Sequence, residues 1–143
     1  MFGLKKTKVE IIIEGDEVHE LKKTLLRIHE SLNPNMPQEL VDAIKRAYFI
    51  TLQLDHAKAH SLSEEGHILE ELCCLLVSGA DYIKTAIRNA VVIDFSYDFL
   101  YIVRLLNFIV QRALSQELEF IRLLNNIDST TTGIIENYNT RAA

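Results

Sequence analysis

The sequence is poor in residues that cross-link or interrupt a chain. It has no tryptophan, two cysteines, two prolines and five glycines among 143 residues. Cys73 and Cys74 are adjacent, so they cannot join distant elements, and their aliphatic neighbours disfavour a reactive thiolate. Such a pair is typical of reduced core residues in a cytoplasmic protein. The glycines are scattered singly, which excludes a glycine-rich phosphate loop.

Long apolar runs are also missing. The most apolar segment, residues 95–110, is interrupted by Asp98, Arg104 and Asn107. It falls short of the roughly 20 clean apolar residues that a membrane helix needs. No apolar run directly follows the N-terminal lysines, so no signal peptide is expected. We therefore expect no transmembrane segment and a cytoplasmic location.

Basic residues are too few for a general nucleic-acid-binding protein. The chain is acidic, with 15 lysines and arginines against 20 acidic residues and a formal net charge of −5. Neutralising phosphates needs a surplus of basic charge instead. The basic N-terminal tail, residues 1–8, is too short to anchor the chain in a membrane. The length and the ordinary composition, 48% apolar and 24% charged, predict a single domain over residues 1–143.

The most prominent structural feature of the sequence is the stretch 94–127. It has no glycine and no proline, which favours one long helix. Apolar residues recur along it every seven positions, and in its first half they fill nearly every face. Such a helix must be buried on most sides, and a second copy of the chain would do this more easily than one chain alone. We therefore predict a homo-oligomer with subunit contacts at Phe99, Ile102, Leu106, Ile109 and Phe120.

Shorter helices are predicted to pack along this stretch. Apolar periodicity and capping residues place them at about 16–32, 37–60, 63–77 and 82–92. Ser78 and Gly79 would end the third of these helices. The fourth could instead continue into the long helix.

Strands are predicted only near the two ends of the chain. Residues 9–14 alternate between apolar and polar, as a half-buried strand does. A lone strand needs a partner, and the comparable stretch is TTTGII at residues 130–135, in a polar C-terminal tail that spans 128–143. The expected fold class is therefore mainly α: a bundle of four to five helices with a long C-terminal helix, plus short terminal strands that pair.

One cluster could bind a metal ion. His56, His60, Glu64 and His67 would share one face of a continuous helix, because their spacings are four, four and three. Imidazole and carboxylate ligands in such an arrangement can hold zinc or iron. A helix break near Ser61 would scatter them and leave solvated histidines at a polar helix end. The sequence leaves both interpretations open.

His19 begins the stretch HELKKTLLRI near the start of a predicted helix. This stretch resembles the region around the phospho-accepting histidine of histidine kinases and phosphotransfer domains. It departs from that pattern at Thr24, where a proline is expected, and at Lys23, where phosphotransfer domains have a small glycine. No ATP-binding segment follows. The resemblance implies phosphotransfer as a distant alternative only.

These features favour a non-enzymatic helical oligomer that acts through protein–protein contacts, as a structural subunit, an adaptor or a small regulator. The alternative is a metal-binding helical bundle that uses the histidine and glutamate cluster. No motif in the sequence specifies a reaction or a ligand.

Overall fold

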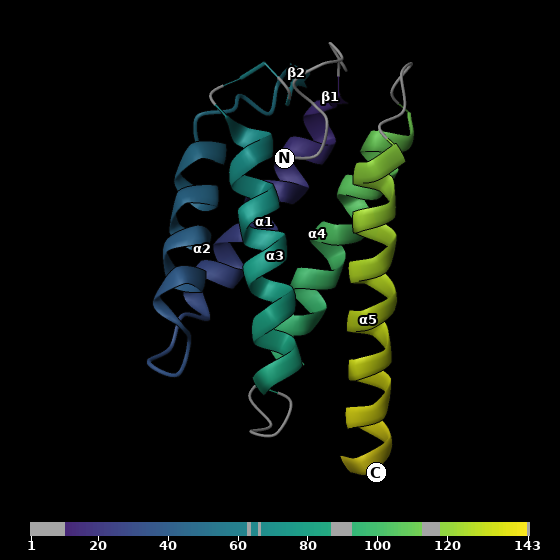
Figure 1. The fold of residues 1–143 in the computed structure, drawn as a ribbon. Coiled ribbons are helices and arrows are strands. Elements are labelled where there is room, and N and C mark those ends of the chain that lie inside the picture. Colours follow the sequence, from purple (N-terminus) through teal and green to yellow (C-terminus); the bar gives the residue numbers. More distant parts are fainter. Residues whose placement is uncertain (1–10, 63, 66, 87–92, 113–117, 143) are drawn as a thin grey trace.

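The chain folds as a bundle of helices with a small sheet near its N-terminal end (Figure 1). The computed structural model describes residues 11–62, 64–65, 67–86, 93–112 and 118–142. The elements within these ranges are β1 (Ile12–Ile13), α1 (Gly15–Glu30), α2 (Gln38–Thr51), β2 (His60–Ser61), α3 (Ile68–Ala86), α4 (Ile93–Gln111) and α5 (Leu118–Ala142). The mainly helical fold predicted from the sequence is confirmed. None of the described helices is long and apolar enough to cross a membrane.

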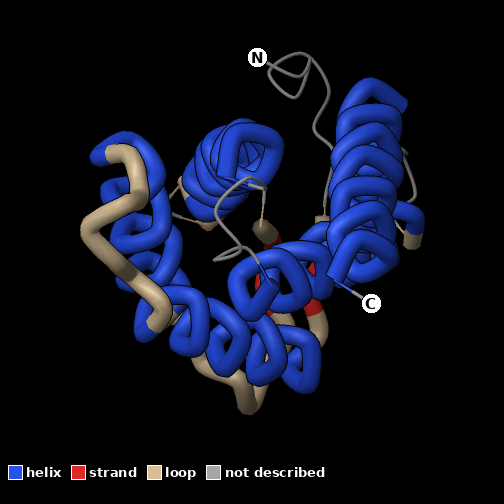
Figure 2. The backbone as a smooth tube through the Cα atoms, turned by 90° about the horizontal axis from the view of Figure 1, so that it is seen from below, coloured by secondary structure: helices blue, strands red, loops and turns tan. Residues whose placement is uncertain are grey.

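Helix α4 connects the parts of the bundle. Helices α1, α3 and α5 all contact it, whereas α2 packs against α1 and α3. Figures 1 and 2 show α2 and α5 on opposite sides of the bundle. The core is continuous across these contacts, because Phe99 of α4 and Phe120 of α5 belong to the same buried cluster as Leu21 of α1 and Ile44 of α2.

Helix α1 forms much as the sequence predicts. The backbone N–H of Glu14 donates to Oε1 of Glu17 at 2.8 Å, and the Glu14 side chain accepts from the backbone of Glu17 in return. This reciprocal capping satisfies donors that the first turn of a helix leaves unpaired. The buried residues then follow the expected three- and four-residue spacing: Val18, Leu21, Leu25 and Ile28.

The prediction that the two ends of the chain pair as strands is wrong. Strand β1 pairs antiparallel with β2, and Ile13 lies opposite His60. Residues 130–135 belong to α5 instead. Thr131 is buried there and Ile134 packs against the core. Burial against the bundle therefore overrides the low helix propensity of this β-branched segment.

The stretch 94–127, predicted as one helix, is divided between α4 and α5, and residues 113–117 lie outside the described ranges. The side-chain amide of Asn107 donates to Oδ1 of Asn125 at 2.7 Å. In one straight helix these residues, 18 positions apart, would be separated by roughly 27 Å. The two halves of the apolar seam thus face each other. The long C-terminal helix exists, but it is α5.

Two other helix ends differ from the prediction. Helix α3 continues through Ser78 and Gly79, where a break was expected. A Cβ atom added at Gly79 would overlap the ring of Phe99, so this glycine allows α3 to approach α4 closely and does not end a helix. Helix α2 ends at Thr51, well before the predicted residue 60. Residues 87–92, predicted to be helical, lie outside the described ranges.

Replacing Gly79 with alanine is expected to destabilise the protein, whereas Gly133→Ala in α5 should stabilise it. Overpacking a core costs about 1–3 kcal/mol, which exceeds the gain of about 0.5–1 kcal/mol from better helix propensity. A Cβ at Gly133 meets no described atom within 4 Å, so only the gain remains there. Urea unfolding followed by circular dichroism measures both effects. The same sign of effect at both positions would contradict the close approach of α3 and α4.

Candidate functional site

The five residues predicted as subunit contacts lie inside a single chain. Phe99, Ile102, Leu106 and Phe120 are fully buried, and Ile109 is 1% exposed. Helices α1, α3 and α5 provide this cover. A contact between two copies through α4 would involve its exposed residues instead.

The four candidate metal ligands do not share a helix. His56 lies in the loop after α2, His60 is in β2, and Glu64 and His67 lie in the turns before α3. His60 is buried, while the other three are exposed. Within the described ranges no group of three or more metal-ligating side chains is placed to hold an ion. Metal binding by these four residues stays a prediction from their spacing, which metal analysis of the purified protein would test.

His60 has a structural role in the fold. Its Nδ1 lies 2.8 Å from Oε1 of Glu65, and its Nε2 lies 2.9 Å from the backbone oxygen of Asp55. Both partners are acceptors, so the ring satisfies both contacts only when it is protonated on both nitrogens. The Glu65 carboxylate, and then the Asp55 carbonyl, raise the pKa of His60. The His60 ring thereby connects Asp55, in the loop after α2, with Glu65, in the turn before α3.

The other candidate reactive side chains are the two cysteines of α3 and His19 of α1. Burial raises the pKa of the Cys73 thiol to about 12, so this group is protonated at neutral pH and is a poor nucleophile. Cys74 is exposed on α3. His19 is exposed on α1, and its ring centroid lies 5.6 Å from that of His56. Phosphorylation of His19 stays a prediction from its sequence context.

The outer face of α4 carries a row of exposed aromatic side chains. Tyr97, Tyr101 and Phe108 are 49%, 41% and 59% exposed, and their spacing of four and seven places them on one line along the helix. We call these three residues the α4 aromatic row. Arg104 lies in the same line, and its Nε donates to Oδ2 of Asp128 at 3.0 Å. The guanidinium of Arg112 lies over the Phe108 ring, 5.1 Å from its centroid.

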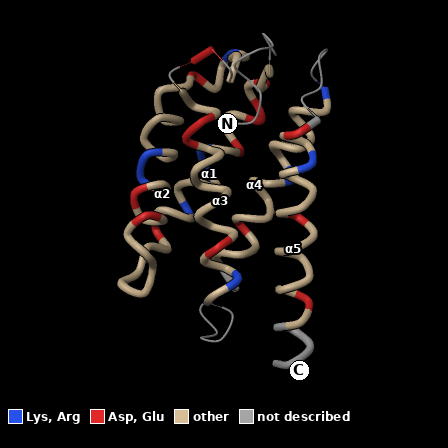
Figure 3. The backbone as a smooth tube through the Cα atoms, in the orientation of Figure 1, with Lys and Arg blue, Asp and Glu red and all other residues tan. Residues whose placement is uncertain are grey.

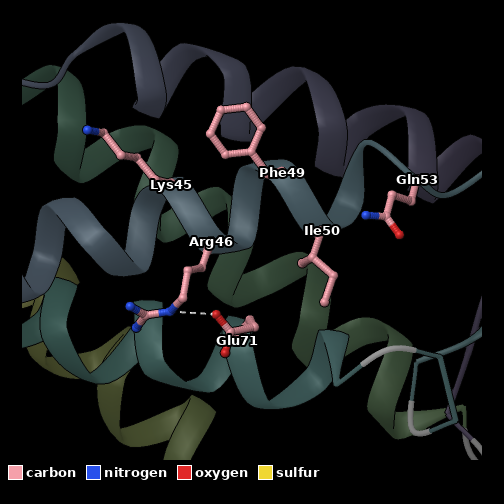
Figure 4. Close-up of a pocket in the computed structure, with 6 residues that line it drawn as sticks. All are labelled: Lys45, Arg46, Phe49, Ile50, Gln53 and Glu71. Carbon is pink, nitrogen blue, oxygen red and sulfur yellow. Dashed lines mark hydrogen bonds and ion pairs between the residues drawn. The ribbon is translucent and has the colours of Figure 1, made fainter.

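A second apolar surface lies at the C-terminal end of α2. Phe49 and Leu52 are 54% and 46% exposed. Beside Phe49 is an open hollow with a volume of about 440 Å³, which we call the α2 hollow (Figure 4). Nε of Arg46 donates to Oε2 of Glu71 at 2.7 Å and so joins α2 to α3 across this hollow. Its lining residues are Lys45, Arg46, Phe49, Ile50, Gln53 and Glu71.

The sequence contains signals for some of these features. The residues of the α4 aromatic row stand opposite the seam of Phe99 and Leu106 on a helical wheel, so their spacing alone could have identified an outer face. The glutamate that pairs with His60 is Glu65, while the sequence argument selected its neighbour Glu64. The conformation of the turn before α3 decides which of these two glutamates reaches His60, and the sequence does not show it.

Comparison with known proteins provides no assignment of function: no family model, no curated protein and no solved structure matches the chain. The functional argument therefore rests on the surfaces described above.

The contacts of His60 predict a dependence of stability on pH. Because its pKa is raised in the folded state, the imidazolium contributes stability that is fully present below the ordinary value of 6.5. This contribution is lost as the pH rises through the folded-state pKa. Urea midpoints measured across this range should therefore fall, and Glu65→Gln should flatten the fall. Glu64→Gln, at the exposed neighbour, is the control. The same profile for both variants would show that the contact with Glu65 adds no stability.

Proposed function

We propose that this protein is a non-enzymatic helical protein that works by contacts with other protein chains, and that it self-associates through the α4 aromatic row. The observation that carries the proposal is the row itself: three partly exposed rings on one line of a helix whose opposite face is buried. Clustered apolar surface of this kind marks interaction sites, whereas single exposed apolar residues do not.

The electrostatics of the row suit contact between two identical chains. The one charged residue between its members, Arg104, is paired with Asp128, so no unpaired charge interrupts the row. Two copies with a formal charge of −5 each can meet there without local repulsion. In a two-fold antiparallel arrangement, Tyr97 of one copy would lie near Phe108 of the other, and offset or edge-to-face ring pairs would follow.

The size of the row limits the strength of this contact. A whole aromatic side chain buries about 150–250 Å², so three partly exposed rings provide less than the roughly 800 Å² per partner of a standard interface. We therefore expect a weak dimer whose population depends on protein concentration.

Substitutions at an exposed and a buried position of α4 distinguish effects on assembly from effects on stability. Phe108→Ala should leave the unfolding free energy within about 0.5 kcal/mol of the wild type, because surface substitutions have small effects, but it should shift the mass toward the monomer. Leu106→Ala should cost about 2–5 kcal/mol of stability, because it opens a cavity in the core. Light scattering over a concentration series measures the mass, and urea unfolding measures the stability.

Val77→Ala is the control for the mass measurement. Val77 is 45% exposed on α3, outside the row, so its loss should leave the mass unchanged. A wild-type protein that stays monomeric at the highest soluble concentration would overturn the proposed self-association.

A further inference from the structure

The α2 hollow combines apolar walls with basic charge. Phe49 and Ile50 line it, and Phe49 also packs against the rings of Tyr48 and His29, with centroids 5.3 Å and 5.9 Å away. These contacts hold the Phe49 ring in place although half of it is exposed. Leu52, the residue directly after the end of α2, continues the exposed apolar surface three positions further along the chain. An anchored ring beside a hollow is a surface that can receive an apolar side chain.

The charge of the hollow is positive in an acidic protein. Its lining contains two cations, Lys45 and Arg46, and one anion, Glu71, which pairs with Arg46 (Figure 4). Figure 3 shows a basic segment in the middle of α2. Lys45 forms no ion pair with any carboxylate in the described part of the chain. The carboxylate of Asp42, one turn before Lys45, accepts a hydrogen bond from Gln38 at 2.8 Å and is not among the lining residues. Because Arg46 is paired with Glu71, the lining has a surplus of one positive charge, on Lys45, beside apolar surface.

We propose that the α2 hollow is the docking site for an amphipathic helix of a partner protein, with apolar residues on one face and acidic residues along its edge. An apolar side chain of the partner enters between Phe49 and Ile50, a neighbouring one covers Leu52, and its carboxylates face Lys45 and the free edge of Arg46. This is the helix-in-groove mode of recognition, in which apolar anchors supply affinity and charges select the partner.

Shape and composition favour this occupant over a small ligand. Small-molecule sites enclose most of their ligand, whereas this hollow is open and Phe49 stands half exposed at its edge. A simple anion would use Lys45 and Arg46 but would leave the apolar surface of Phe49 and Leu52 uncovered. An acidic amphipathic helix matches both components. This proposal uses a different helix from the self-association through α4, and neither depends on the other.

Two synthetic peptides test the proposal. Both have about 16 residues, enough for several helical turns, and both repeat leucine at helical spacing. One carries glutamates at the edges of its apolar face and the other carries lysines. Titration into ¹⁵N-labelled full-length protein, followed by NMR, should show that the glutamate peptide shifts the amides of residues 45–53 and that the lysine peptide does not.

Matched variants identify the contacts. Lys45→Glu and Phe49→Ala should each weaken binding of the glutamate peptide by about tenfold or more, as expected for a facing charge and a central anchor. Lys84→Glu is the control for charge, because Lys84 lies roughly 20 Å along α3 from Glu71. Phe108→Ala is the control for the other apolar surface, and it should bind the peptide normally even where it changes the oligomeric mass.

Four results would overturn the proposal: equal binding of both peptides, binding of neither peptide, shifts located away from residues 45–53, or unchanged affinity in Lys45→Glu. Inorganic phosphate is titrated separately. If phosphate alone produced the same shifts and displaced the peptide, the hollow would be a simple anion site instead. Because light scattering on the same samples reports self-association, failure of this proposal and failure of the α4 dimer can be told apart.

Discussion

Burial of α4 is the constraint on which the rest of the structure depends. This helix is apolar on most of its faces, so it is stable only when other elements cover it. Helices α1, α3 and α5 do so, and the glycine at position 79 allows α3 to come close enough for contact with Phe99. The need to cover α4 also explains why α5 runs back along it, since Phe120 and Leu124 of α5 thereby join the core. The line of α4 that remains uncovered contains the α4 aromatic row.

Arginine contacts along α4 complement this apolar packing. Arg27 of α1 pairs with Asp98, Arg104 pairs with Asp128 of α5, and Arg112 pairs with Glu17 at the start of α1. Nη2 of Arg112 also donates to the backbone oxygen of Ile12, at 3.2 Å. Partly exposed ion pairs add little stability each. The elements that they join matter more here. Two of the three pairs connect α1 to the two ends of α4, and the third connects α4 to α5, so together they favour one arrangement of these three helices.

The functional proposals rest on two surfaces that this packing leaves exposed, the α4 aromatic row and the α2 hollow. The α4 aromatic row carries no unpaired charge and suits a second copy of an acidic chain. The α2 hollow is apolar and locally basic and suits an acidic helix. A protein with two such surfaces can bind a partner while it self-associates, which is what an adaptor or a structural subunit requires. The four predicted metal ligands contribute to neither surface, and His60 instead stabilises the loop beside the small sheet.

The sequence by itself determined the mainly helical class, the position of α1, and the strongly apolar character of the region around Phe99 and Leu106. These follow from local periodicity, which depends on neighbouring residues only. Only the tertiary structure decided that β1 pairs with β2, that residues 130–135 are helical, and that the apolar seam of α4 faces α5 of the same chain. Each of these depends on which distant segments meet, and burial in those contacts outweighs the modest propensity of any single residue.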